Sequence, residues 1–263
     1  MSKWVVGLLF ATHVIHAEDI FTNEFETLVS SRVNHIELKD PHLFQEGIGC
    51  TDYTGFVNDF VINSAFNNDS DGDSYLDLNM MLKFKTDQTE YLVSKSLLLD
   101  RIDGLCPDPL FSAPCTINQA TQVNVTTSFS QTVSCLAPID GTTSNYIEPV
   151  ISAGAPCFVT EPQDVLLQLS GVMIPLDSYQ EAARYQGGLI LDQGLHMGFI
   201  SETAAMNVVI PESFPFLGGN TLFDLLPGGN SCSPGDDRDI GPDGVTLGWW
   251  LYFNTTADLV ELL

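Results

Sequence analysis

Alternation of apolar and polar residues is the clearest pattern in the chain, and it predicts strands. Between residues 75 and 85 every second position is apolar and most positions between are polar: Leu76, Leu78, Met80, Leu82 and Phe84. A period of two is typical of a strand with one buried and one solvated face. Three further segments are predicted as strands: the β-branched stretch 123–129, the nearly continuous apolar run 165–174, which favours a central strand, and the alternating segment 249–254.

Helical signals are few and short. Ser178, followed three residues later by Glu181, has the spacing of a capping box and predicts a helix that continues through residue 184. Two further short helices are predicted over 201–205 and 220–226, the second ended by a Pro-Gly-Gly sequence. Each segment is long enough for roughly two turns.

Short strands separated by turn residues favour a mainly β fold. The 21 glycines and 14 prolines interrupt the chain at short intervals. We therefore expect an antiparallel sandwich-like or barrel-like arrangement with a few short helices, and not a doubly wound parallel sheet. After an N-terminal leader, residues 18–263 fit one elaborated β domain. Two smaller β domains, with a boundary within 104–120, are the alternative.

Residues 1–17 have the pattern of a secretory signal peptide. Lys3 gives the positive start, 4–15 the apolar middle, and Ala17 a small residue at the expected cut. The apolar run is too short to cross a bilayer as a helix, and no later segment is long and apolar enough to do so. We expect a soluble, secreted mature chain, extracellular or periplasmic, without a transmembrane segment.

The cysteines support the same location. An even number of cysteines in an exported chain favours disulfides, and the spacings are not those of a zinc site. The candidates are Cys50, Cys106, Cys115, Cys135, Cys157 and Cys232. Cys106 and Cys115 could close a short proline-rich loop, but the sequence does not choose among the 15 pairings that six cysteines allow.

The charge balance excludes one class of partner. Lys and Arg number 9 against 34 Asp and Glu, which gives a formal net charge of -25. Such a surface repels phosphate backbones and anionic lipids, so we expect no nucleic-acid partner. Only 16% of the residues are charged and 44% are hydrophobic, which favours a folded chain over a disordered one.

Segment 67–78 places four aspartates at alternating or nearby positions, and this pattern predicts a calcium site. The expected ligands are Asp69, Asp71, Asp73, the Tyr75 carbonyl and Asp77, at alternating positions of one loop. Ca²⁺ prefers six to eight oxygen ligands in a flexible geometry, and a divalent cation would remove the repulsion among these carboxylates. The alternative is an acidic hairpin whose side chains are solvated.

This segment resembles the D-x-D-x-D-x-x-x-D loops of thrombospondin type 3 repeats and of FG-GAP blades in integrin-like propellers. The resemblance covers only residues 67–78 and implies a calcium loop that leads into a strand. Ser74 stands where such loops usually have glycine, and Met80 stands where an EF-hand has a bidentate glutamate. The motif occurs once, whereas propeller blades repeat, so neither an EF-hand nor a propeller is indicated.

A second acidic segment, 234–244, is a weaker candidate for a metal site. Its carboxylates are Asp236, Asp237, Asp239 and Asp243. Arg238 lies among them and could neutralise one directly, which would give an arginine-braced turn without a metal.

Motifs of common catalytic sites, such as H-E-x-x-H and G-x-S-x-G, are absent from the sequence. His196 alternates with apolar neighbours and is predicted to lie on a strand surface. Trp249 and Trp250 should point to opposite faces, with only one in the core. A sugar-stacking role for Trp250 and Tyr252 is the alternative.

These observations favour a binding or structural protein over an enzyme. We expect an exported, calcium-stabilised β-rich module, with a surface protein or a glycan as candidate partner. A secreted hydrolase with a structural calcium and a subunit of a cell-surface assembly are the alternatives.

Overall fold

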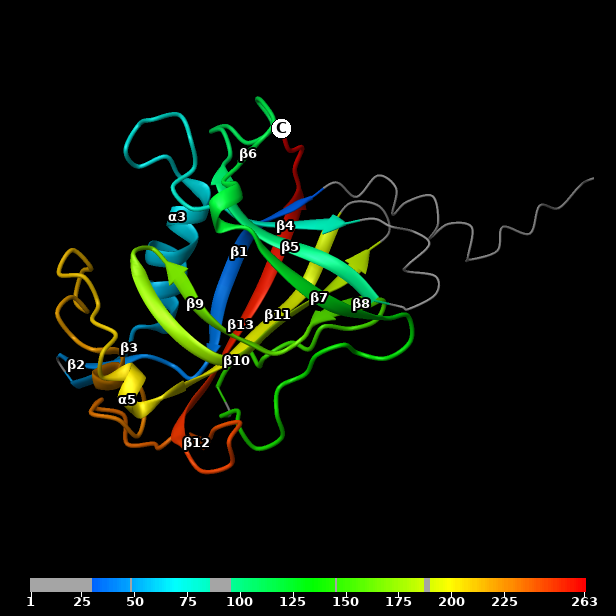
Figure 1. The fold of residues 1–263 in the computed structure, drawn as a ribbon. Helices are drawn as coiled ribbons and strands as arrows, with labels where there is room; N and C mark the ends of the chain where they lie inside the picture. Colours follow the sequence, from blue (N-terminus) through cyan, green and yellow to red (C-terminus); the bar gives the residue numbers. More distant parts are fainter. Residues whose placement is uncertain (1–29, 48, 86–95, 145, 187–189) are drawn as a thin grey trace, which may run out of the picture.

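The structure is a computed structural model that describes residues 30–47, 49–85, 96–144, 146–186 and 190–263. The expected signal peptide, residues 1–17, lies outside these ranges. Strands make up most of the regular structure, and the helices are short (Figure 1). The prediction of a mainly β, antiparallel and barrel-like fold is confirmed.

Eight strands form one antiparallel sheet that closes on itself. Each strand pairs with the next, and β13 pairs back with β1. In order around the sheet they are β1 (Ser31–Asp40), β4 (Met80–Lys85), β5 (Ser96–Leu105), β7 (Val123–Ser130), β8 (Cys157–Thr160), β10 (Val172–Gln186), β11 (Ile190–Ser201) and β13 (Leu247–Leu259). The sheet therefore has an interior and an outer face.

Smaller elements surround this sheet. The short strands are β2 (Phe44–Gly47), β3 (Gly49–Asp52), β6 (Thr116–Ile117), β9 (Gln163–Leu169) and β12 (Asp239–Ile240). The helical segments are α2 (Thr54–Phe56), the π-helix η2 (Val57–Ile62), α3 (Asn63–Asn67), the 3₁₀ turn η3 (Gln119–Thr121), α5 (Glu202–Ala205) and α6 (Leu222–Leu225). None of the helices in the described ranges combines the length and apolar character needed to cross a membrane.

Two strand predictions are confirmed and two need correction. Segments 123–129 and 249–254 lie in β7 and β13. The strand expected from residue 75 starts only at Met80, because residues 76–78 make backbone bonds to other segments, such as Leu76 N to Cys106 O. Segment 165–174 is a hairpin and not one strand, because Ser170 and Gly171 both have positive φ and turn the chain between β9 and β10.

The helix predicted over 178–184 is wrong, because this segment lies within β10. The capping-box spacing of Ser178 and Glu181 is a local signal, whereas strands on both sides of β10 supply hydrogen bonds to its backbone. The other two helix predictions are confirmed as α5 and α6. Ser201 caps α5 as expected, whereas Thr221 caps α6 through a capping box with Asp224.

Both faces of β13 are buried, so the prediction that only one tryptophan lies in the core is wrong. Trp249 is fully buried in the main cluster, which also contains Leu251 and Phe253. Trp250 is 5% exposed and packs in a separate cluster with Tyr252, under the segment that contains Leu136. A sheet covered on both sides leaves no aromatic platform for a sugar at these positions.

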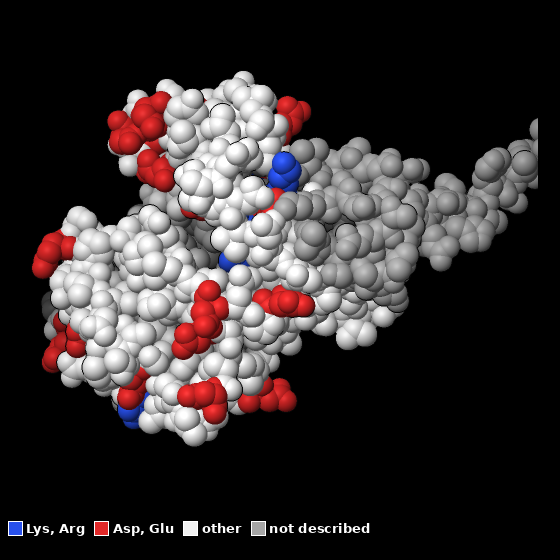
Figure 2. Space-filling model, viewed as in Figure 1, with Lys and Arg blue, Asp and Glu red and all other residues white. Residues whose placement is uncertain are grey.

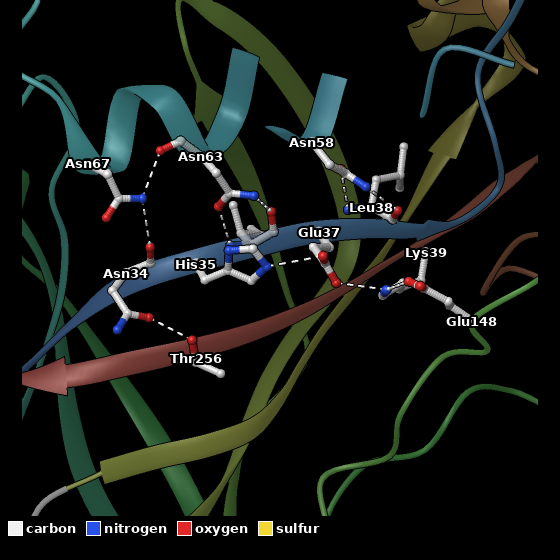
Figure 3. Close-up of polar contacts among 11 residues, drawn as sticks. Asn34, His35, Glu37, Leu38, Lys39, Asn58, Asn63, Asn67, Glu148 and Thr256 are labelled. Carbon is white, nitrogen blue, oxygen red and sulfur yellow. Dashed lines mark hydrogen bonds and ion pairs between the residues drawn. The ribbon is translucent and has the colours of Figure 1, made fainter. Parts of the chain in front are cut away.

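Helical side chains complete the edge of β1. In the described part of the chain, β1 pairs with β4 only through Ser31 and Arg32. Asparagines of η2 and α3 bind backbone groups along the rest of that edge (Figure 3): Asn58 with Leu38, Asn63 with Ile36, and Asn67 with Asn34. The i→i+5 hydrogen bonding of the π-helix, in which Asn63 N donates to Asn58 O, brings Asn58 and Asn63 onto one face. This contact fixes the helical segment beside the barrel.

Candidate functional site

The acidic segment forms a loop between α3 and β4, at the end of the cyan helix in Figure 1. Its two ends are joined by a backbone bond from Asp77 N to Asn68 O. The buried guanidinium of Arg32 also binds both sides of the loop, through the carbonyls of Phe66 and Leu78. The loop is therefore held at its base by the folded barrel.

Three of the predicted ligands come together at this loop. Asp69, Asp71 and Asp77 each place a carboxylate oxygen within 4.8 Å of the others. Oxygens bound to one Ca²⁺ lie 2.3–2.6 Å from it and hence at most about 5 Å from one another. The spacing therefore fits a shared calcium ion. In the described residues this is the single group of three or more potential ligands that meets this distance.

The other two predicted ligands are engaged differently. Asp73 is not part of the group of three, and its carboxylate accepts a hydrogen bond from Tyr75 N at 2.8 Å. Tyr75 forms an isolated bridge with Pro107. An ion at this site would need its remaining oxygen ligands from backbone carbonyls, water or a movement of Asp73.

Backbone amides stabilise the charged form of Asp69. Desolvation raises the pKa of this carboxyl, but hydrogen bonds from the N–H groups of Ser74, Gly72 and Asp73 outweigh it and hold the pKa below its usual value. Gly72 has a φ of 80°, which a residue without a side chain adopts most easily. These bonds therefore favour the ionised form of Asp69.

Acidic patches dominate the face of the molecule drawn in Figure 2, where blue atoms are few. One red patch lies at the outer edge of the lobe in which Figure 1 places the loop between α3 and β4. The negative potential of the whole chain, with a formal charge of -25, adds to the local attraction for cations.

The four aspartates of the second acidic segment have different partners. Asp236 accepts two hydrogen bonds from the guanidinium of Arg238, at 2.9 and 2.7 Å, and one from its backbone N–H at 3.1 Å, and Arg238 also pairs with Glu202 at 2.8 Å. Asp243 caps its own turn, and hydrogen bonds from the side chain and N–H of Thr246 help lower its pKa to about 2. Asp236 therefore takes part in the arginine-braced turn that was the alternative to a metal site. The four carboxylates of this segment do not come together in one group.

Asp237 and Asp239 instead lie near Asp40, which the sequence did not single out. Asp237 accepts hydrogen bonds from Ser144 and Tyr146, and Asp40 accepts one from Ser144 N at 2.7 Å. Burial raises the pKa of Asp40 to about 7, although the hydrogen bond from Ser144 N lowers it, and the nearby charge of Asp237 adds to the rise. Burial also raises the pKa of Asp239 to about 6. The sequence predicted no strand here, and Asp40 is the last residue of β1 in the structure.

A second polar group missed from the sequence lies inside the barrel. Arg101 on β5 pairs with Glu181 on β10 at 2.8 Å, and Tyr179 contacts His196 on β11 at 2.6 Å. His196 is 3% exposed, so its prediction as a surface residue is wrong. Its burial lowers its pKa to about 4 despite the opposing charge of Glu181, so the imidazole is neutral at pH 7. Arg101, a cation within an apolar strand, is the one sequence signal for this group.

The six cysteines form three disulfides: Cys50–Cys232, Cys106–Cys115 and Cys135–Cys157. The short loop considered from the sequence, closed by Cys106 and Cys115, is one of them. The bond from Cys50 to Cys232 joins the β2–β3 hairpin to a segment 182 residues later. These bonds fit an oxidising compartment.

Comparisons with protein-family models, with curated proteins and with solved structures find no match to this chain. The fold and the site are therefore interpreted from their own geometry alone.

Proposed function

We propose that this chain is an exported protein that binds one Ca²⁺ through Asp69, Asp71 and Asp77 and acts as a calcium-stabilised binding or structural module. The observation that carries the proposal is the convergence of these three carboxylates within 4.8 Å on one loop. Bringing three negative charges together causes repulsion, and a bound cation would offset it. The ion stabilises the connection between α3 and β4.

An exported protein would meet enough Ca²⁺ to fill a site of the affinity expected here. Extracellular calcium modules bind at about 10⁻⁴–10⁻³ M, a concentration that external fluids reach and cytosol does not. The three disulfides and the leader-like pattern of residues 1–17 both support a location outside the cytoplasm.

A binding role is favoured over catalysis by the way in which the ionisable groups inside the barrel are paired. Inside the barrel, Arg101 and Glu181 pair with each other, and Tyr179 bridges to His196. The void beside Glu181 and His196 measures about 10 Å³, which is room for about one water molecule. A group of this kind has no space for a substrate and serves the stability of the barrel.

Thermal unfolding with and without calcium tests the proposal. With a Kd of about 10⁻⁴ M, about 10 mM Ca²⁺ should stabilise the fold by about 2.7 kcal/mol, which is a rise in Tm of about 5–10 °C over the value in chelator. Asp71→Asn and Asp77→Asn should each abolish most of this rise. Asp59→Asn, which removes an exposed carboxylate outside the loop, is the matched control and should keep it. Equal Tm values for the wild type in calcium and in chelator would contradict the proposal.

A further inference from the structure

We propose that an apolar cavity beside η2 binds the end of an aliphatic chain that carries a neutral or positively charged head group. The cavity encloses about 60 Å³, and every residue that lines it is Leu, Ile, Val or Phe. Leu251 and Phe253 of β13 and Leu217 contribute to its buried wall. This inference rests on the proposed binding role and names the class of ligand, and it does not depend on calcium.

The lining of the cavity comes close to the surface on one side. Most of its lining is buried, whereas Val57 and Val61 on η2 and Phe214 on the facing loop are partly exposed. The mouth therefore lies between the π-helix and the loop 210–217. A π-helix of this length is rare, and such turns are frequent at functional sites.

Aromatic rings lie on both of the segments that border this mouth. On the helical side, Phe56 and Phe60 stack with centroids 5.3 Å apart, and Phe216 on the loop lies 5.8 Å from Phe56 and 5.7 Å from Tyr53. Phe60 is 70% exposed and Phe216 is 66% exposed. An exposed aromatic patch next to a cavity with an apolar lining indicates a ligand site, because apolar area left in water is unfavourable.

The size of the cavity sets how the ligand binds. An enclosed apolar cavity of about 150 Å³ stays dry and holds benzene. At about 60 Å³ this one has room only for the last few carbons of a chain, and the remaining carbons would lie across the rings of Phe56, Phe60 and Phe216. Binding should therefore strengthen with chain length until the rings are covered.

The charges near the mouth select the head group. Asp59 on η2 and Glu212 on the facing loop are exposed, and neither 53–62 nor 210–217 contains Lys or Arg. A carboxylate or phosphate head would meet negative potential there, whereas an ammonium or hydroxyl head would not. A fatty amine or a fatty alcohol fits this site better than a fatty acid.

Calorimetric titration with 1-dodecanol, dodecylamine and dodecanoate below their aggregation limits tests the inference. Dodecanol and dodecylamine should bind at one site, and dodecanoate about tenfold more weakly at low salt, with the difference shrinking as salt rises. Val61→Phe, which fills the mouth at a partly exposed position, should weaken dodecanol binding at least tenfold. Val245→Phe adds the same bulk at a distant exposed position and should bind as the wild type does.

A second variant keeps the test independent of changes within the cavity. Phe60→Ser combined with Phe216→Ser removes only exposed rings and should weaken the binding of long chains more than that of hexanol. Unchanged dodecanol affinity in Val61→Phe, or no binding by the wild type, would overturn the inference. The inference would also be overturned if the aromatic patch bound neutral phosphatidylcholine vesicles, or a second copy of the chain, while the protein bound no alcohol. Repeating the titrations in chelator and in calcium shows whether alcohol binding depends on the calcium site. Alcohol binding that is the same in both buffers would stand even if the calcium proposal failed.

Discussion

The side chain of Asn63 pairs with both backbone polar groups of Ile36. The N–H of Ile36 donates to Oδ1 at 2.9 Å, and Nδ2 donates to the carbonyl of Ile36 at 3.0 Å. Asn58 repeats the same pair of bonds with Leu38. The helical segment thus takes the place of a neighbouring strand, and the edge of β1 is not left open to pair with another chain.

Replacing Asn63 should test this relationship. Asn63→Ala leaves two buried backbone groups of Ile36 without partners and should lower the free energy of unfolding by about 3 kcal/mol. Asn67→Ala is the matched control, because Asn67 is exposed and should cost under about 1 kcal/mol. Denaturant titration of both variants measures the difference, and equal losses would show that the Asn63 bonds add little.

Acid should destabilise the barrel through His196. The pKa of this imidazole falls from 6.5 to about 4 on folding, chiefly by burial, so folding favours the neutral form. Its contribution is complete above pH 6.5 and is lost as the pH falls towards 4, by about 3 kcal/mol. The stability of the wild type relative to His196→Gln should decrease by this amount over that range. A constant difference between the two proteins at all pH values would refute the assignment.

Asp40 should act in the opposite direction. Its pKa rises from 3.8 to about 7 on folding, chiefly by burial and with a contribution from the charge of Asp237, so the folded state favours the protonated acid. This stabilisation is present at low pH and is lost as the pH rises through 7. Asp40→Asn keeps an acceptor for Ser144 N. It should exceed the wild type in stability by about 2 kcal/mol at about pH 8 and match it near pH 4. Denaturant titrations at the two pH values measure this, and a variant that is less stable than the wild type at the higher pH would contradict it.

The long disulfide should contribute more than the short one. Cys50–Cys232 closes a loop over a separation of 182 residues, and Cys106–Cys115 over 9. Because the entropy removed from the unfolded chain grows with loop length, the double serine variant of the first pair should lose about 4–5 kcal/mol and that of the second about 2–3 kcal/mol. Thermal unfolding of the two variants ranks them, and the reverse order would point to strain or residual structure in the unfolded chain.

The sequence predicted those parts of the fold in which local pattern and tertiary environment agree. Segment 249–254 alternates and lies in a strand, and the short helices α5 and α6 lie within the segments 201–205 and 220–226 expected to be helical. The acidic loop was recognisable because its carboxylates are close along the chain. Local spacing was misleading at Ser178, where pairing with β8 and β11 decides the conformation.

The remaining features depend on contacts between distant segments. Glu181 looks like part of a helix cap until Arg101, 80 residues earlier, is placed beside it inside the barrel. The asparagines of η2 and α3 look like ordinary surface residues, because their partners are backbone groups of β1. The pKa of Asp40 becomes unusual only when folding buries this residue and brings the charge of Asp237 near it.

The number of calcium ions bound per chain tests the central claim most directly. Equilibrium dialysis at millimolar Ca²⁺ should find one ion on the wild type, with a Kd of about 10⁻⁴–10⁻³ M. It should find none on the double variant Asp71→Asn, Asp77→Asn, and one on the control Asp236→Asn. Equal calcium binding by the double variant and the wild type, or none by the wild type, would contradict the calcium site at this loop.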